Sequence, residues 1–115
     1  MELLGVGTDI VEVNRFQKID NKFLERYFTS KEIEYFLERQ NNAQTISGNF
    51  ASKEAIVKAI GEGFRNLKAK DIEVIRDTKG KPIVNILNDD YKDIKFMISI
   101  SHTKNYATAF AVAYI

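Results

Sequence analysis

Apolar residues recur along this chain with two different periods. In the first half they return every three or four positions, as on one face of a helix, and in the second half they alternate as in strands. The pattern predicts helices over residues 15–27, 30–39 and 43–60, and strands over residues 3–13, 71–76, 83–87, 95–101 and 106–115. A strand followed by helices and then a run of strands predicts a single α+β domain over residues 1–115.

Local signals mark the ends of the predicted helices. Asn14 is a candidate cap for the first helix. Thr29 and Glu32 form a capping box that opens the second helix. The third helix is expected to end at Gly61 or Gly63, because glycine readily adopts the left-handed conformation that closes a helix.

The last predicted strand has two contrasting faces. One face carries Tyr106, Thr108, Phe110, Val112 and Tyr114, and the other carries Ala107, Ala109, Ala111 and Ala113. A face of small side chains lets a helix or another subunit pack closely against it. Upstream, the turn residues at 77–82 join the second and third predicted strands as a hairpin.

The segment from residue 50 to residue 61, within the third predicted helix, is apolar on nearly every side. Such a helix is normally buried. Glu54 and Lys58 lie together on its one polar side, and burying either charge without a partner would cost several kcal/mol. Either the two side chains simply pair with each other, which stabilises a helix by only a few tenths of a kcal/mol, or they hold a ligand.

Asp9 is unexpected within the first predicted strand, because aspartate is depleted from strands. Gly5 and Gly7 interrupt the same strand, and glycine in a strand often marks a bulge or a close approach of the backbone to a ligand. The alternative interpretation is an edge strand whose aspartate faces water.

Composition narrows the classes of function. The chain has 44% hydrophobic and 29% charged residues, and its net charge of +1 argues against general nucleic-acid binding. It has no cysteine, no segment long enough to span a membrane and no signal-peptide pattern at Met1. We therefore expect a soluble cytoplasmic protein without a membrane or nucleic-acid partner. Its 115 residues bury only a modest core, so association with other copies would add stability.

Four basic residues follow a helical spacing along the first predicted helix, and we call them the basic stripe: Arg15, Lys18, Lys22 and Arg26. Most charged faces of this kind are simply solvated. Aligned like charges can also steer an acidic partner to a docking surface.

Three separated segments together resemble a known enzyme family. They are residues 5–15 (GVGTDIVEVNR), residues 50–61 (FASKEAIVKAIG) and residues 98–102 (ISISH) followed by Tyr106-Ala107. In order, spacing and total length they resemble the holo-acyl-carrier-protein synthases, the short single-domain 4′-phosphopantetheinyl transferases, over nearly the whole chain.

This resemblance implies a fold, a reaction and an assembly. The fold is an antiparallel sheet packed against helices. The reaction moves 4′-phosphopantetheine from coenzyme A to a serine of apo acyl carrier protein and releases adenosine 3′,5′-bisphosphate. It uses Mg²⁺, with Mn²⁺ as the alternative, and usually serves fatty acid biosynthesis. The small members of the family form homotrimers with active sites at subunit interfaces.

The resemblance also implies roles for individual residues. Asp9 and Glu54 fall on the metal-binding carboxylates, Lys58 on a lysine beside the reacting phosphate, and His102 on a histidine associated with coenzyme A. The first three form the expected catalytic set. The coenzyme A channel is expected to include Lys58, Gly61, Gly63, Lys81 and Pro82. Turn chemistry explains the glycines and the proline equally well, and a histidine at a strand end is often structural. Since acyl carrier proteins are acidic, the basic stripe becomes a docking surface for the carrier.

Physical chemistry supports the metal and phosphate roles independently. Mg²⁺ takes hard oxygen ligands, commonly one or two carboxylates together with substrate phosphates. Asp9 and Glu54 supply such a pair if the first strand packs beside the third helix. Phosphoryl transfer needs positioning and charge stabilisation, to which Lys58 can contribute. The attacking serine belongs to the carrier, and its base is either a metal-bound water or one of the two carboxylates.

The chain departs from the family pattern just before residue 50. Family members often carry arginine there, where it can hold the 3′-phosphate of coenzyme A, whereas this chain has Asn49. Ser52 also replaces an alanine of the family run. By position Asn49 is the expected coenzyme A contact here, but an asparagine offers hydrogen bonds and no charge. Either coenzyme A binding is weakened, or Lys53 or another nearby cation compensates.

Two other classes of protein compete with the transferase. A non-catalytic oligomeric module could bind nucleotides or an acidic partner, but it has no need of a carboxylate pair near a buried helix. A different magnesium-dependent nucleotide enzyme is the weaker alternative, because the sequence lacks a Gly-x-x-x-x-Gly-Lys phosphate loop. We therefore expect the transferase.

Overall fold

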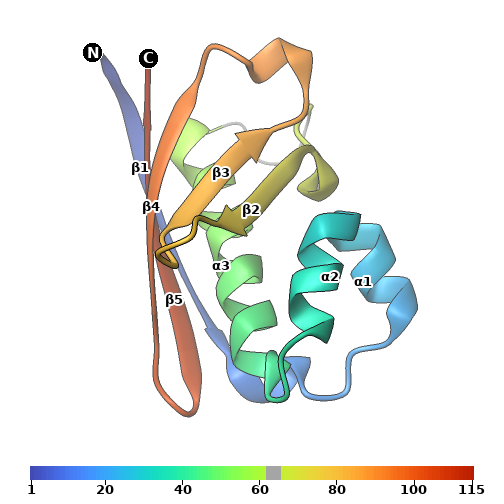
Figure 1. Ribbon diagram of the computed structural model, residues 1–115. Helices are drawn as coiled ribbons and strands as arrows, with labels where there is room; N and C mark the ends of the chain where they lie inside the picture. Colours follow the sequence, from blue (N-terminus) through green and yellow to red (C-terminus); the bar gives the residue numbers. More distant parts are fainter. Residues whose placement is uncertain (62–65) are drawn as a thin grey trace.

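The computed structural model describes residues 1–61 and 66–115, and Figure 1 shows these as two small sheets and a group of helices. The strands are β1 Leu3–Glu12, β2 Ile72–Arg76, β3 Pro82–Ile86, β4 Lys95–His102 and β5 Tyr106–Tyr114. The helices are α1 Asn21–Tyr27, α2 Ser30–Leu37 and α3 Asn42–Ile60, with short 3₁₀ segments η1 Val13–Phe16, η2 Ala69–Asp71 and η3 Asp89–Tyr91. This arrangement confirms the α+β class.

The larger sheet is antiparallel, with strand order β1-β5-β4, and the smaller sheet is the antiparallel β2-β3 hairpin. α3 lies along one face of the larger sheet, while α1 and α2 pack on the opposite side of α3 (Figure 1). The two edge strands, β1 and β4, are therefore separated by β5.

The alanine face of β5 and two glycines of β1 allow α3 to approach the sheet closely. All four alanines, Ala107, Ala109, Ala111 and Ala113, are buried in the core. A methyl group added at Gly5 or Gly7 would collide with the backbone oxygen of Ala59 or Ala55 on α3. Of the two partners expected for the alanine face, the structure thus shows a helix. The strand glycines were expected to mark a bulge or a close approach to a ligand. The close approach is instead to α3, and the β1–β5 register is irregular just before Gly5.

The single helix predicted over residues 15–27 is wrong. The chain forms η1, a short connection, and then α1, which begins only after Asp20. The Asp20 carboxylate accepts a hydrogen bond from the backbone N–H of Phe23 at 2.9 Å, so Asp20 rather than Asn14 caps the helix. A side chain that caps the backbone in this way starts a new helix rather than continuing an old one.

The predicted start of α2 and the predicted end of α3 are confirmed, whereas α2 ends at Leu37 rather than at residue 39. The Thr29 hydroxyl accepts from the N–H of Glu32, and the Glu32 carboxylate accepts from the N–H of Thr29, which completes the capping box of α2. Gly61 closes α3 with a φ of 76°, in the left-handed region. The alternative end at Gly63 lies outside the described residues. Gly80, with a φ of 86°, sits in the turn of the β2-β3 hairpin.

The second face of the larger sheet carries exposed apolar side chains. Val6 and Ile10 on β1 are 62% and 63% exposed, Phe110 on β5 is 47% exposed and Met97 on β4 is 53% exposed. We call this surface the open sheet face. A contiguous apolar patch of this kind commonly marks an interaction site. Across the described ranges, no helix is long and apolar enough to cross a membrane.

Candidate active site

Asp9, Glu54 and Lys58 come together at the seam between β1 and α3. Because side chains alternate along β1, the Asp9 carboxylate points toward α3. The close packing at Gly7 brings α3 near enough for its side chains to contact Asp9. The Lys58 ammonium lies 3.2 Å from Asp9 Oδ1 and donates a further hydrogen bond to the Thr8 carbonyl at 3.1 Å. Lys58 thus pairs across the seam with Asp9. Within the described ranges, no Glu54–Lys58 ion pair shorter than 4.0 Å is present.

Burial and the neighbouring Asp9 make the ionised form of Glu54 less favourable. Partial burial, and then the negative charge of Asp9, raise the pKa of Glu54 above its ordinary value. A hydrogen bond from Tyr27 and the positive charges of Lys58 and Arg15 act in the opposite direction. Like charges held together in this way are stabilised by a cation between them.

The donor set of the seam fits magnesium. Asp9 Oδ2 is buried and has no hydrogen-bond partner among the described residues. Among residues 1–61 and 66–115, no cluster of three or more His, Cys, Asp or Glu side chains is arranged to hold a metal ion. Two carboxylates leave coordination positions for water and substrate oxygens, which is the usual arrangement around Mg²⁺. Asp9 and Glu54 are therefore the residues that could hold it.

Tyr27 is a further residue of the seam that the sequence analysis did not identify. Its hydroxyl donates a hydrogen bond to Glu54 Oε2 at 3.3 Å. Burial and the neighbouring Glu54 carboxylate raise the pKa of Tyr27. In the sequence, Tyr27 is one of four apolar residues with helical spacing, Phe16, Ile19, Phe23 and Tyr27. Nothing in that spacing distinguishes a ring in the core from a ring whose hydroxyl is hydrogen-bonded.

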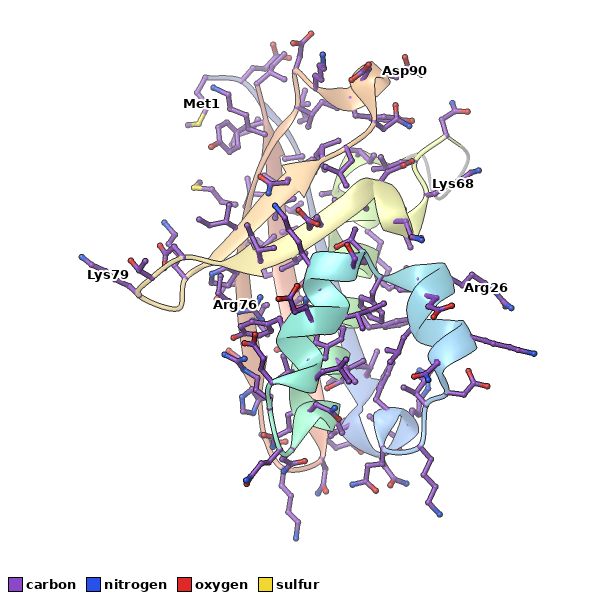
Figure 2. All side chains as sticks on the ribbon, turned by 45° about the vertical axis from the view of Figure 1, so that its right-hand side comes forward. Met1, Arg26, Lys68, Arg76, Lys79 and Asp90 are labelled. Carbon is purple, nitrogen blue, oxygen red and sulfur yellow. The ribbon has the colours of Figure 1, made fainter. Side chains whose placement is uncertain are left out.

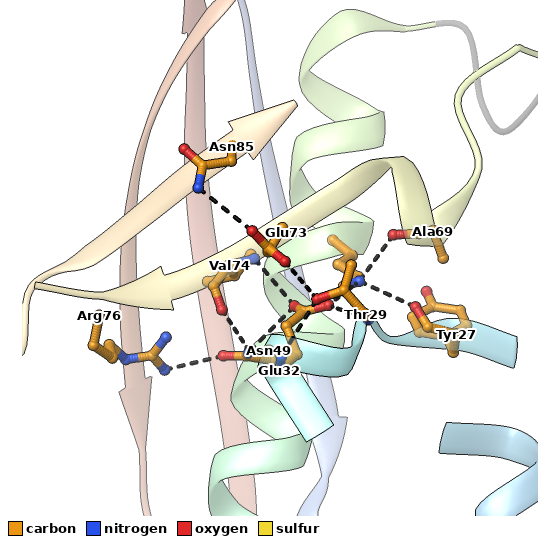
Figure 3. A network of polar contacts seen from close by, with 10 residues as sticks. Tyr27, Thr29, Glu32, Asn49, Ala69, Glu73, Val74, Arg76 and Asn85 are labelled. Carbon is orange, nitrogen blue, oxygen red and sulfur yellow. Dashed lines mark hydrogen bonds and ion pairs between the residues drawn. The ribbon is translucent and has the colours of Figure 1, made fainter. Parts of the chain in front are cut away.

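Lys53, the neighbour of Glu54 in sequence, points into the core rather than into the seam. Its ammonium is fully buried and donates to Glu32 Oε1 at 2.7 Å, to the Tyr27 carbonyl at 3.0 Å and to the Ala69 carbonyl at 2.8 Å (Figure 3). Burial lowers the pKa of Lys53, and the Glu32 carboxylate partly offsets this effect. Lys53 therefore does not supply the cation that would compensate for Asn49.

Asn49 is also part of this buried network. Its amide donates to the Val74 carbonyl at 3.0 Å and to Glu32 Oε2 at 3.4 Å, and its oxygen accepts from Arg76 at 3.0 Å (Figure 3). Asn49 was predicted to bind coenzyme A, but its side chain is fully buried in this chain and its polar atoms are engaged within the protein. The amide instead holds the Arg76 guanidinium.

A second group of predicted residues meets at a separate cavity. Its volume is about 420 Å³, and it lies between the β2-β3 hairpin and β4. The lining residues include Arg76, Lys81, Pro82, Ser99 and His102. Three of these were predicted coenzyme A contacts. Arg76 was not, and one nitrogen of its guanidinium is buried without a hydrogen-bond partner in the described part of the chain.

The seam and this cavity do not form one continuous site within a single chain. Asp9 on β1 lies opposite Ala109 of β5, whereas His102 on β4 lies opposite Ala107 of β5. Because β5 separates the two edge strands, their backbones are about 10 Å apart. The structure thus brings together Asp9, Glu54 and Lys58 in one place, and Lys81, Pro82 and His102 in another. Gly61 lies beyond Lys58, at the end of α3.

The basic stripe is divided by the break in the first predicted helix. Arg15 lies in η1, where its guanidinium carbon is 5.6 Å and 5.8 Å from the ring centroids of Phe16 and Phe50. Lys18 is in the connection, and Lys22 and Arg26 lie four residues apart on α1. All four side chains are exposed, and Figure 2 shows Arg26 extending outward from α1. They form an exposed basic surface rather than one helical stripe.

Comparisons with known proteins agree with this architecture. A sequence model of the 4′-phosphopantetheinyl transferase superfamily matches residues 5–111. A Clostridium botulinum protein named holo-[acyl-carrier-protein] synthase is 53% identical over 116 aligned positions, which cover 94% of each chain.

Two solved structures extend the similarity to the fold. The holo-(acyl-carrier-protein) synthase of Bacillus anthracis, in complex with CoA (3′,5′-ADP), is 35% identical, with a TM-score of 0.87 over 98% of this chain and 97% of that chain. The Helicobacter pylori enzyme, in complex with coenzyme A, is 32% identical, with a TM-score of 0.83 over 95% of this chain and 99% of that chain.

The fold and the matched sequence define an enzyme of the group-transferring class. The chain belongs to the 4′-phosphopantetheinyl transferase superfamily. Both the family resemblance and the prediction of a phosphopantetheinyl transferase are therefore confirmed.

Proposed function

We propose that this chain transfers 4′-phosphopantetheine from coenzyme A to a serine of apo acyl carrier protein in a Mg²⁺-dependent reaction. The products are holo acyl carrier protein and adenosine 3′,5′-bisphosphate, and the reaction serves fatty acid biosynthesis in the cytoplasm. The observation that carries this proposal is the Asp9–Glu54 carboxylate pair at the β1–α3 seam, with Lys58 beside it.

Asp9 and Glu54 would hold the metal ion. Asp9 Oδ2 has no other partner in the described structure, and Glu54 gains from a neighbouring cation because its pKa is raised by burial and by Asp9. When bound, Mg²⁺ neutralises charge on the pyrophosphate of coenzyme A. The two carboxylates thereby fix the position of the phosphorus that bears the pantetheine arm.

Lys58 supplies a second positive charge at the reacting group. Its side chain is 58% exposed, so its ammonium can reach an incoming phosphate as well as Asp9. The serine oxygen of the carrier bonds to the pantetheine-bearing phosphorus, and the bond from that phosphorus to adenosine 3′,5′-bisphosphate breaks. Lys58 stabilises the charge that develops on this leaving group. The serine proton leaves to a base, and the nearest carboxylates are those of Asp9 and Glu54.

A homotrimer with active sites between subunits is the assembly we propose. The open sheet face supplies an apolar surface for a second copy. The separation of the seam from the His102 cavity supports the same assembly, because a neighbouring subunit can bring its cavity to the seam. In this arrangement, Lys81, Pro82 and His102 of one chain bind coenzyme A beside Asp9 and Glu54 of the next.

The exposed basic surface of Arg15, Lys18, Lys22 and Arg26 is the proposed docking site for the acidic carrier. Arg15 also lies close enough to Glu54 to affect its pKa, so this surface begins beside the seam. A carrier docked there would present its serine near the metal ligands.

Isosteric substitutions of the two carboxylates test the site. Asp9→Asn and Glu54→Gln keep the side-chain shape but remove the negative charge needed for Mg²⁺. We expect each to lower kcat by at least about 100-fold in a coupled assay with coenzyme A and apo carrier. Circular dichroism should show an unchanged fold. Full activity of both variants would show that the metal assignment is wrong.

A further inference from the structure

Tyr27, the last residue of α1, is fixed in place by an aromatic stack. Its ring lies 5.4 Å from Phe23 with an interplanar angle of 8°, and 4.9 Å from Phe50 with an angle of 22°, measured between ring centroids. Phe23 and Phe50 also stack on each other at 6.4 Å. Three rings from α1 and α3 thus form one cluster, in which Tyr27 has little freedom to rotate.

The main chain of Tyr27 is held independently of its ring. The buried ammonium of Lys53 donates a hydrogen bond to the Tyr27 carbonyl at 3.0 Å (Figure 3). Lys53 is itself fixed by its 2.7 Å ion pair with Glu32 and by its bond to the Ala69 carbonyl. A buried polar network whose members are all satisfied in this way is rigid.

The third constraint on Tyr27 is the bond from its hydroxyl to Glu54 Oε2, at 3.3 Å. Lys53 and Glu54 are adjacent in sequence, so successive residues of α3 contact opposite ends of the same tyrosine. One binds its carbonyl in the core, and the other accepts its hydroxyl at the seam. The orientation of the Glu54 carboxylate is therefore linked to the rigid core network.

We propose that Tyr27 is a positioning residue for Glu54, holding one carboxylate oxygen so that the other is presented to the cation beside Asp9. This inference rests on the proposed function, in which Asp9 and Glu54 hold the metal. Carboxylates that bind metals are typically oriented by a hydrogen bond of this kind, and its loss commonly weakens metal affinity or activity by 10- to 100-fold. In this proposal the Tyr27 hydroxyl is engaged by Glu54, so Tyr27 affects the cation through Glu54.

The test is Tyr27→Phe, which removes the hydroxyl and keeps the ring in its stack. Mn²⁺ serves as the probe, titrated into the protein at saturating coenzyme A while electron paramagnetic resonance counts the free ion. We expect the Mn²⁺ affinity of the variant to fall about tenfold, at the lower end of the range for such hydrogen bonds because Glu54 is only partly buried. The melting temperature should stay that of the wild type.

Turnover provides a second readout. If Tyr27 only orients Glu54, excess Mg²⁺ should restore the kcat of Tyr27→Phe, and the Mg²⁺ concentration for half-maximal activity should rise about tenfold. A general structural defect would lower kcat at every metal concentration. The matched control is Tyr35→Phe on α2, whose ring centroid lies 3.4 Å from the Arg39 guanidinium carbon and 5.5 Å from that of Arg76. The described contacts of Tyr35 include none with Asp9, Glu54 or Lys58, and saturating coenzyme A removes any effect through Arg76 on coenzyme A binding. We expect no change in its metal dependence.

Three results would overturn the inference. The first is a Mn²⁺ affinity of Tyr27→Phe within about twofold of the wild type. The second is a loss of kcat that excess Mg²⁺ does not restore. The third is an equal loss of affinity in Tyr35→Phe. Failure of the proposed function can be distinguished from these results. In that case the wild type would bind no Mn²⁺ in the presence of coenzyme A, or Glu54→Gln would bind Mn²⁺ as tightly as the wild type.

Discussion

At the scale of single residues, the seam between β1 and α3 concentrates charge where the backbone packing is tightest. Gly7 lets α3 come close enough for Lys58 to reach the Asp9 carboxylate at 3.2 Å. The same approach places Glu54 within electrostatic range of Asp9, which helps to raise the pKa of Glu54. The charges that make this seam suitable for a cation therefore depend on two residues without large side chains, Gly7 and Ala55.

The exposed basic surface should affect the rate at which an acidic carrier associates with the enzyme. It should not affect the rate of the chemical step. We expect Lys22→Glu/Arg26→Glu to raise the apparent KM for carrier protein about tenfold, to leave kcat unchanged and to flatten the salt dependence of kcat/KM. Steady-state kinetics over a range of ionic strength would measure this.

The matched control for carrier docking is Lys92→Glu, in the connection before β4 and distant in sequence from α1. Its salt dependence should resemble that of the wild type. A double variant on α1 whose kinetics also match the wild type at every ionic strength would rule out this docking surface.

At the scale of elements, the buried network around Lys53 and Glu32 connects α2, α3 and β2. Glu32 Oε2 accepts from the N–H of Val74 on β2, and Glu73 of the same strand accepts from the hydroxyl of Thr29, which caps α2 (Figure 3). Three elements that are distant in sequence thus share one set of polar contacts. The network therefore holds α2, α3 and β2 together through buried polar contacts.

Breaking the buried ion pair should destabilise the fold. Lys53→Met removes the ammonium and leaves the Glu32 carboxylate buried without its partner, so we expect the free energy of unfolding to fall by about 3–5 kcal/mol. Glu32→Gln/Lys53→Met should recover part of this loss, because no unpaired charge remains. Urea denaturation followed by circular dichroism measures both. A loss of less than about 1 kcal/mol in Lys53→Met would contradict a stabilising role for the pair.

Much of the secondary structure could be predicted from the sequence, because strand alternation, the capping box of α2 and the end of α3 at Gly61 are local signals. The helix over residues 15–27 could not, because its apolar spacing continues across a break that is made by the hydrogen bond of Asp20. Lys53 also could not be placed, because a lysine in an Ala-rich helix normally faces solvent. Only the fold shows that Glu32 and two carbonyl groups surround it.

The residues of the candidate site that could be predicted are those whose residue type is unusual at its position in the sequence. Asp9 and Glu54 are carboxylates at positions that disfavour charge, and the structure brings both to one seam. The positions of Tyr27 beside Glu54 and of Arg76 beside Asn49 depend on contacts between distant segments, which no local pattern reveals. The burial of Asn49 against β2 could not be predicted, because sequence alone cannot distinguish the sides of α3 that face solvent from the side that faces β2.

At the scale of the whole molecule, the larger sheet is covered by α3 on one face and presents apolar side chains on the other. The seam and the cavity near His102 lie at opposite edges of this sheet. The exposed apolar face and the separation of the seam from the cavity are both explained if the open sheet face packs against other copies of the chain. Assembly and activity would then be coupled, because each site would need residues from two subunits.

A charge placed on the open sheet face should separate the subunits. We expect Phe110→Glu to stay folded, to sediment as a monomer and to lose most of its activity. Burying a carboxylate in an apolar interface costs several kcal/mol. Leu37→Glu is the matched control, because Leu37 is 70% exposed on α2, away from the sheet. Sedimentation velocity measures the masses. A monomeric wild type at micromolar concentration, or an oligomeric Phe110→Glu, would contradict the proposed assembly.

The most direct test of the central claim is a single mass-spectrometric measurement. The protein is incubated with coenzyme A, Mg²⁺ and an apo acyl carrier protein, with parallel samples that contain EDTA or the Glu54→Gln variant. We predict that the carrier gains the mass of one phosphopantetheine group on its serine, and that neither parallel sample forms this adduct. An unmodified carrier in the complete mixture, with the protein folded, or equal modification in the presence of EDTA, would contradict the account.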